Sequence, residues 1–174
     1  KICEDPKGRI WFSGGDHWGT DRTNNPDRYE RPWGYGSTIV SCYDPGSNKV
    51  TETFDLDKVS AIFSNAETPG HGKIHANIQS DSKGCIWTAG YMGASYDHEF
   101  GNAYFPKSYA GGAVVKWDPK TNQVEYFGVP TPYGGQVALY LDEKRNIVHG
   151  FAVDRGRYWR LNYVTREVKL YETN

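Results

Sequence analysis

A short internal repeat constrains this chain more than any other feature. The stretch Asp5–Trp11, DPKGRIW, recurs as Asp81–Trp87, DSKGCIW, and more faintly as Asp142–Val148, DEKRNIV. Asp can open a turn through its side chain, and Gly8 or Gly84 can take a left-handed conformation. The motif therefore predicts a hairpin whose returning strand begins at the isoleucine. The third copy lacks the glycine, which leaves its turn type open.

A second motif follows each copy of the first one. It reads CYDPGSNKV at 42–50, KWDPKTNQV at 116–124 and RLNYVTREV at 160–168, always with Asp or Asn six positions before a valine. Proline at the second turn position pre-sets φ in the first two copies, and alternating strand residues flank each turn. The repeating unit is thus four antiparallel strands, A to D, with an A–B turn, a B–C connection and a C–D turn.

Four-stranded meanders in tandem are typical of the blades of a β-propeller. We predict an all-β fold with three such blades, at about 1–56, 74–129 and 135–173, within a single propeller segment. The 20 glycines, nine prolines and 15% aromatic residues agree with turn-rich β structure. Propellers usually close with four to eight blades. We therefore expect this chain to belong to a larger, six- to eight-bladed propeller whose remaining blades lie elsewhere.

The two motifs together, D-x-x-G-x-I-W followed by W-D-P-x-T-x-x-V, resemble bacterial propellers that include virginiamycin B lyase and the SMP-30/gluconolactonase-like group. The resemblance covers the structural turns and strands of all three blades. It implies a ring with a ligand site at one mouth of the central channel, where the lyase uses a histidine beside a magnesium ion. The catalytic signature of that family is not matched residue by residue, so its activity is not carried over.

Charge and composition exclude several classes of partner. The 20 basic and 21 acidic residues nearly balance, which disfavours a nucleic-acid or anionic-membrane partner, and no apolar run is long enough to span a bilayer. The first residues lack the pattern of a secretion signal, so we expect a soluble chain that is mature or truncated. Three cysteines cannot all pair within the chain. They leave the compartment open, with a periplasmic or extracellular location favoured.

The lengths of the connections predict which end of the blades carries the function. From the strand-B isoleucine to the Asp or Asn of the C–D turn there are 34, 32 and 15 positions in the three blades, and the connection before the second blade is also long. All of these long connections fall at one end of a meander, whereas the A–B and C–D turns fall at the other. Long connections in compact domains tend to be functional.

The insertions combine aromatic rings with charged groups, a mixture that suits a sugar-like or lactone-like ligand. The predicted substrate-binding residues are Trp18, Arg22, Trp33, Tyr91, Tyr96 and Asp154. The alternative is that these aromatic side chains pack the insertions onto the ring.

Histidines are the candidate catalytic groups. His75 is expected in the inner strand A of the second blade, at the position matched by Gln136 in the third, where it could reach the channel mouth as a general base or hydrogen-bond a neighbouring blade. His71 would act beside it, and Arg155 would neutralise substrate charge. His149 aligns with Phe12 and Thr88 and is predicted to be a packed structural histidine. A divalent metal ion could be held by four histidines, namely His17, His71, His75 and His98.

Two function classes remain open at this stage. One is a lyase or hydrolase of a sugar-like or lactone-like substrate. The other is a non-catalytic ligand- or protein-binding propeller module, or a subunit of a larger assembly. The predicted partners are a small-molecule or carbohydrate ligand and the remaining propeller blades.

Overall fold

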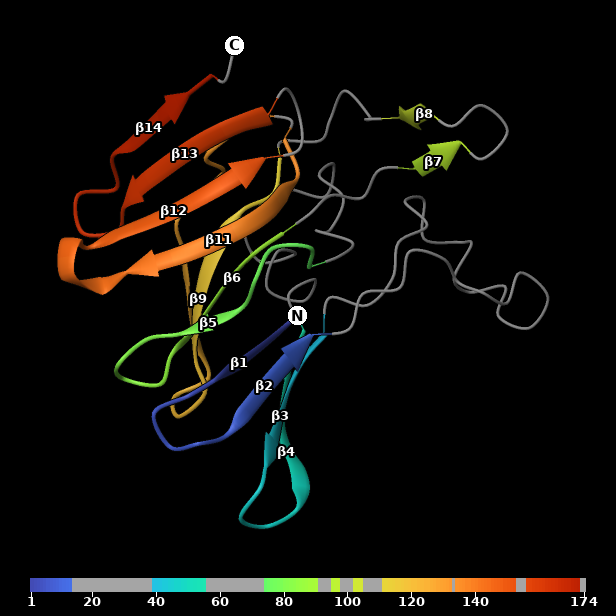
Figure 1. Ribbon diagram of the computed structural model, residues 1–174, viewed down its shortest axis with the longest axis vertical. Coiled ribbons are helices and arrows are strands. Elements are labelled where there is room, and N and C mark those ends of the chain that lie inside the picture. Colours follow the sequence, from blue (N-terminus) through green and yellow to red (C-terminus); the bar gives the residue numbers. More distant parts are fainter. Residues whose placement is uncertain are drawn as a thin grey trace.

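The computed structural model describes residues 1–13, 39–55, 74–90, 95–97, 102–104, 111–132, 134–152 and 156–172 of the 174. These residues form three four-stranded antiparallel sheets and one separate two-stranded hairpin (Figure 1). In each four-stranded sheet the strands pair in chain order. The prediction of an all-β fold with three meander blades of the propeller type is confirmed.

Each blade is named here by its order in the chain. Blade 1 contains β1 (Ile2–Glu4), β2 (Ile10–Ser13), β3 (Ile39–Asp44) and β4 (Lys49–Asp55). Blade 2 contains β5 (Gln79–Ser80), β6 (Ile86–Ala89), β9 (Val114–Asp118) and β10 (Gln123–Tyr126), and β7 (Ser95–Asp97) pairs with β8 (Asn102–Tyr104) between β6 and β9. Blade 3 contains β11 (Gln136–Asp142), β12 (Ile147–Ala152), β13 (Arg157–Asn162) and β14 (Val168–Tyr171), with the short 3₁₀ helix η1 (Glu143–Arg145) after β11.

The A–B turns of blades 1 and 2 are built around a buried aspartate. Asp81 accepts hydrogen bonds from the backbone N–H groups of Lys83 and Cys85, at 3.0 and 2.8 Å, and from the indole Nε1 of Trp87 at 3.1 Å. Asp5 bonds Trp11 in the same way, at 3.0 Å. One side chain thus closes the turn and satisfies the indole that starts the returning strand. This explains why Asp and Trp recur together in the sequence.

The A–B turn of blade 3 is one residue longer. Asp142 caps η1, and Asn146 takes the left-handed conformation (φ 56°) that Gly8 and Gly84 take in the other blades. As a result Asp142 itself pairs with Ile147, whereas in blade 1 the residue before the aspartate, Glu4, pairs with Ile10. The sequence left this turn type open because the third copy lacks the glycine. The structure shows that Asp and Ile keep the same spacing in the sequence but do not keep the same pairing.

The shift corrects the alignment of His149. The sequence matched it with Phe12 and Thr88. In the structure His149 pairs with Tyr140 and Arg160, just as Trp87 pairs with Gln79 and Lys116. His149 therefore occupies the place of Trp11 and Trp87. It is half-buried, and its Nδ1 lies 2.7 Å from the hydroxyl of Tyr158, in agreement with a structural role.

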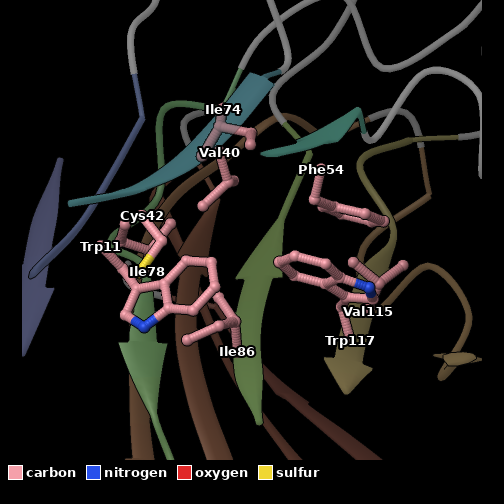
Figure 2. Packing of buried hydrophobic residues seen from close by; sticks show 9 residues of the cluster. All are labelled: Trp11, Val40, Cys42, Phe54, Ile74, Ile78, Ile86, Val115 and Trp117. Atoms are coloured by element: carbon pink, nitrogen blue, oxygen red, sulfur yellow. The ribbon is translucent and has the colours of Figure 1, made fainter. Parts of the chain in front are cut away.

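Two apolar clusters hold the blades together. The first joins Trp11, Val40, Cys42 and Phe54 of blade 1 to blade 2 residues that include Ile86, Val115 and Trp117 (Figure 2). Trp117 meets Trp11 edge to face at 5.4 Å and stacks on Phe54 at 4.7 Å. The second joins Trp87, Val114 and Phe127 of blade 2 to Leu139, Val148, Trp159 and Leu161 of blade 3. We call the side of a blade that points to the following blade its leading face, and the opposite side its trailing face.

Tight turns and long connections lie at opposite ends of the blades. The A–B and C–D turns gather at one end, and β2, β6 and β12 all end toward the other (Figure 1). That other end, from which every B–C connection leaves, is called the insertion end below. Among the described residues no helix is long and apolar enough to cross a membrane.

Candidate functional site

The insertion end is built from the base of the B–C connections and the beginning of the inner strands. Of the predicted site residues, only His75 and the backbone of Tyr96, in β7, lie within the described part of the chain. The other predicted residues lie outside it: His17, Trp18, Arg22, Trp33, His71, Tyr91, His98, Asp154 and Arg155.

His75 lies in a bulge and not in a regular strand. Ile74 bridges Gly90, and the regular pairing of β5 with β6 begins only at Gln79 and Trp87. Four residues, 75–78, therefore stand opposite only two, Thr88 and Ala89, so the ladder is interrupted. The prediction of a continuous inner strand through His75 is wrong for this reason. His75 is half-buried. It lies at the insertion end, because its neighbour Ile74 pairs with Gly90, the residue that follows β6.

Backbone hydrogen bonds tie blades 2 and 3 together beside this bulge. The N–H of Gln136 donates to the carbonyl of Gly90 at 3.1 Å, and the N–H of Gly112 donates to the carbonyl of Gly134 at 2.9 Å. A Cβ at Gly112 would lie 1.8 Å from the carbonyl oxygen of Gly90. Only glycine at position 112 allows these two backbone segments to approach so closely. The base of the second insertion is thereby fixed between the two blades.

Gln136 is the residue that sequence comparison paired with His75, and its role is structural. Its side chain is fully buried, and its Nε2 donates to Thr131 Oγ1 at 2.8 Å and to the carbonyls of Gly112 and Gly134, each at 3.2 Å. Its Oε1 accepts a hydrogen bond from Trp159 Nε1 at 2.6 Å. Gln136 thus holds the turn before β11 against blade 3. Sequence reasoning missed this because two of its partners, Gly112 and Trp159, lie 24 and 23 positions away in the chain.

Within the described ranges, no three His, Cys, Asp or Glu side chains come together as a metal site. Three of the four histidines proposed as ligands lie outside those ranges, so the metal prediction is not tested.

The cysteines are unpaired thiols placed in the blades. Cys42 and Cys85 are buried and Cys3 is half-buried. Burial raises the pKa of Cys3 to about 11 and also raises the pKa values of Cys42 and Cys85. Because the thiolate is the reactive form, these side chains are poor nucleophiles at neutral pH.

Comparisons with known proteins support the fold and do not name a family. No family model matches the chain, and no curated protein matches it. The whole chain superimposes on part of the extracellular domain of a hybrid two-component system from B. thetaiotaomicron, with a TM-score of 0.55 and 11% identity. It covers 16% of that chain, so it spans only a small part of the longer protein. At this identity the similarity shows the fold alone.

A second similarity is weaker. The tricorn protease aligns with 99% of this chain and 22% of its own, at 14% identity and a TM-score of 0.33. We draw no conclusion from a TM-score this low. The resemblance to the virginiamycin B lyase and gluconolactonase-like propellers is therefore confirmed only as far as the propeller-like blades.

Proposed function

We propose that this chain is part of a β-propeller that binds a small polar, sugar-like ligand at the insertion end of its blades. The observation that carries the proposal is the separation of the two ends. Every A–B and C–D turn is tight and packed by its own Asp or Asn, whereas every B–C connection leaves from the opposite end. Binding residues are concentrated on connections that a rigid scaffold positions.

The inner strands add a second argument for the same end. Blade 2 carries the bulge at 75–78, and blade 3 has a register shift between Gln136 and Ala138 at the same end. Bulges are over-represented beside functional sites, where they re-aim side chains. In blade 3 the side chain of Gln136 is used for packing, and we propose that on the inner strand of blade 2 His75 contacts the ligand.

The ligand class follows from the residues that the insertions supply. Flat aromatic rings stack on the apolar faces of sugars, and carboxylate and guanidinium groups bind their hydroxyl or acidic substituents. We propose that the rings are Trp18, Trp33, Tyr91 and Tyr96 and that the charged groups are Arg22 and Asp154.

A second candidate function is lyase or hydrolase chemistry on such a ligand. The placement of His75 in a bulge at the insertion end favours it, since a general base must reach a substrate proton. In this proposal His71 assists His75, and Arg155 stabilises negative charge that develops on the substrate. A divalent cation held among His17, His71, His75 and His98 would serve the same purpose.

Binding is tested with a panel of neutral and acidic oligosaccharides and sugar lactones, measured by isothermal titration calorimetry. We expect Trp33→Ala or Trp18→Ala to weaken binding of the best ligand by about tenfold or more. Tyr140→Ala is the matched control, because this exposed ring lies near the turns at the opposite end and should leave affinity unchanged. No binding to any member of the panel, or equal losses in all three variants, would contradict the proposal.

The catalytic candidate needs a separate readout. Hydrolysis is followed by the release of reducing ends, and elimination by the ultraviolet absorbance of an unsaturated product. His75→Ala should abolish turnover while binding persists, and His149→Ala, a histidine from a turn-proximal strand position, should retain turnover. An unchanged rate in His75→Ala would remove the catalytic role and leave the binding function intact.

A further inference from the structure

Two parts of the proposed ligand site meet blade 3 at one buried residue, Gly90. Ile74, which precedes His75, pairs with Gly90. The N–H of Gly90 donates to the carbonyl of Ala113 at 2.9 Å, which closes the base of the second insertion. The carbonyl of Gly90 accepts a hydrogen bond from the N–H of Gln136, the first residue of β11, at 3.1 Å. The bulge that carries His75, the second insertion and the inner strand of blade 3 are therefore joined through a single residue.

The side chain of Gln136 fastens the other end of the same insertion. Gly112 lies just before β9, and its carbonyl accepts a hydrogen bond from Gln136 Nε2 at 3.2 Å while its N–H donates to Gly134 at 2.9 Å. The same Nε2 donates to Thr131 Oγ1 at 2.8 Å, and Trp159 Nε1 holds the amide oxygen at 2.6 Å. Gln136 and Thr131 are fully buried, so water does not compete for these hydrogen bonds. Gln136 thus ties both ends of the second insertion to blade 3.

The segment that leads into β11 is too closely packed to adjust. A Cβ at Gly134 would lie 2.6 Å from Thr131 Oγ1. Pro130 and Pro132 flank Thr131 and fix φ on both sides of it. Binding groups keep their geometry best when buried packing and a further layer of hydrogen bonds support them. This segment provides such a support.

The two blades are also joined at the opposite end, which offers a comparison. There the N–H and Oγ of Ser82 donate to the carboxylate of Glu143, at 2.9 and 2.7 Å. Both residues are exposed, and they lie in the A–B turn of blade 2 and in η1 of blade 3. The contact links the same two blades as Gln136 does, but at the end away from His75 and the insertions.

We propose that Gln136 is a positioning residue for the ligand site: through Gly90 and Gly112 it sets where His75 and the second insertion stand relative to each other. The inference rests on the function proposed above. A ligand that contacts both His75 and the insertion binds more tightly when the two are already in place, because ordering them on binding costs affinity. Blade 3 therefore contributes to the site through a side chain that does not touch the ligand.

The first test uses the member of the oligosaccharide and sugar-lactone panel that the wild-type chain binds most tightly, measured by isothermal titration calorimetry. We expect Gln136→Leu to weaken binding about tenfold and the milder Thr131→Val about threefold, whereas Thr131→Ser keeps the hydroxyl and should bind as the wild type does. Two controls should keep full affinity: Glu143→Ala breaks the contact between the same blades at the opposite end, and Asp81→Asn removes part of a buried turn there. Equal weakening in the controls, or unchanged affinity in Gln136→Leu, would overturn the proposal.

A second readout needs no ligand. In the free chain, Gln136→Leu should speed hydrogen exchange of the Gly112 N–H about tenfold, the effect of losing about one neutral hydrogen bond. It should also shift the imidazole resonances of His75, and Glu143→Ala should leave both signals unchanged. If no panel member binds the wild-type chain, the function proposed above fails, and these signals still test whether Gln136 positions His75. Either signal unchanged in Gln136→Leu would overturn the proposal, whether or not a panel member binds.

Discussion

Each blade buries one indole completely, but blades 1 and 2 satisfy its N–H differently from blade 3. Trp11 and Trp87 lie on strand B and donate to the charged aspartate of their own A–B turn. Trp159 lies on strand C and donates to the neutral amide oxygen of Gln136. The same physical demand, a buried donor that needs an acceptor, is therefore met by a local turn in two blades and by a long-range contact in the third.

The leading face of blade 3 differs as well. Trp159 lies on the trailing face, in the cluster with Trp87, and the leading-face position of Trp11 and Trp87 is held by His149. The longer A–B turn places His149 there, and His149 bonds Tyr158 instead of the turn aspartate. A polar, aromatic surface thus replaces the apolar one of blades 1 and 2. The predictions below break or sharpen this comparison, beginning with the largest expected effect.

Trp159 packs directly against Gly150. A Cβ at residue 150 would lie 1.9 Å from the ring, so Gly150→Ala must displace either the strand or the indole. We expect a loss of about 3 kcal/mol or more in the free energy of unfolding, measured by urea denaturation. Gly84→Ala is the control. It meets no atom within 4 Å but has φ +83°, so it should cost only about 1 kcal/mol. Equal effects would show that Trp159 is not fixed as described.

Asp81→Ala removes the charged acceptor of blade 2. Two backbone N–H groups and the indole of Trp87 lose their partner together, and two of these hydrogen bonds are buried. We expect a loss of about 2–3 kcal/mol, since an unsatisfied buried donor and a lost charge-assisted bond both contribute. Asp81→Asn keeps one acceptor oxygen and should lose about half as much. A loss in Asp81→Asn as large as in Asp81→Ala would mean that the charge, and not the geometry, holds the turn.

Gln136→Leu removes the neutral acceptor of blade 3. The indole of Trp159 loses its acceptor, and the carbonyls of Gly112 and Gly134 lose a donor. We expect a smaller loss, about 1–2 kcal/mol, because these hydrogen bonds are between neutral groups. The change should also loosen the base of the second insertion, which hydrogen exchange at Gly112 and Gly134 would report. If Gln136→Leu lost more unfolding free energy than Asp81→Ala, the neutral acceptor of blade 3 would stabilise the protein more than the charged acceptor of blade 2.

The sequence predicts the local part of this architecture well. Asp81 and Gly84 act within one turn, so their spacing is enough to identify the hairpin, and the repeat then identifies the blades. The C–D turns behave likewise. Asp44 and Asp118 each accept a backbone N–H two residues on, and Asn48 and Asn122 take left-handed conformations.

The long-range part could not be predicted. Gln136 depends on Trp159, 23 positions away, and on Gly112 of blade 2, so the sequence showed only that it matched the position of His75. The bulge at His75 depends on the pairing of Ile74 with Gly90, which no local pattern encodes. The shift at His149 accompanies η1, after which Asn146 takes the left-handed conformation one position later than the glycines of blades 1 and 2. The remaining site residues lie outside the described ranges, so their predicted roles stand as proposals.

The smallest effect expected concerns pH. Burial of Asp5 opposes its ionisation, but hydrogen bonds from Trp11, Arg9 and Lys7 outweigh this and hold its pKa below the ordinary value of 3.8. A carboxylate with a lowered folded-state pKa stabilises the protein above 3.8, and the contribution is lost as pH falls through the folded pKa. Gln136 does not titrate, so the hydrogen bond of the Trp159 indole should lack this dependence.

Nuclear magnetic resonance of the indole N–H groups can separate the two designs within one sample. Between pH 5 and about 2, the range that covers carboxylate titration, the Trp11 resonance should shift, whereas the Trp159 resonance should stay constant until global unfolding. Hydrogen bonds within their turns also lower the pKa values of Asp44, Asp118 and Asp142, so overall acid sensitivity does not identify Asp5. Asp5→Asn is the decisive variant, because it should flatten the Trp11 titration alone. A Trp159 resonance that titrates with Trp11 would mean that the blades respond to acid as one unit and that the identity of the acceptor is immaterial.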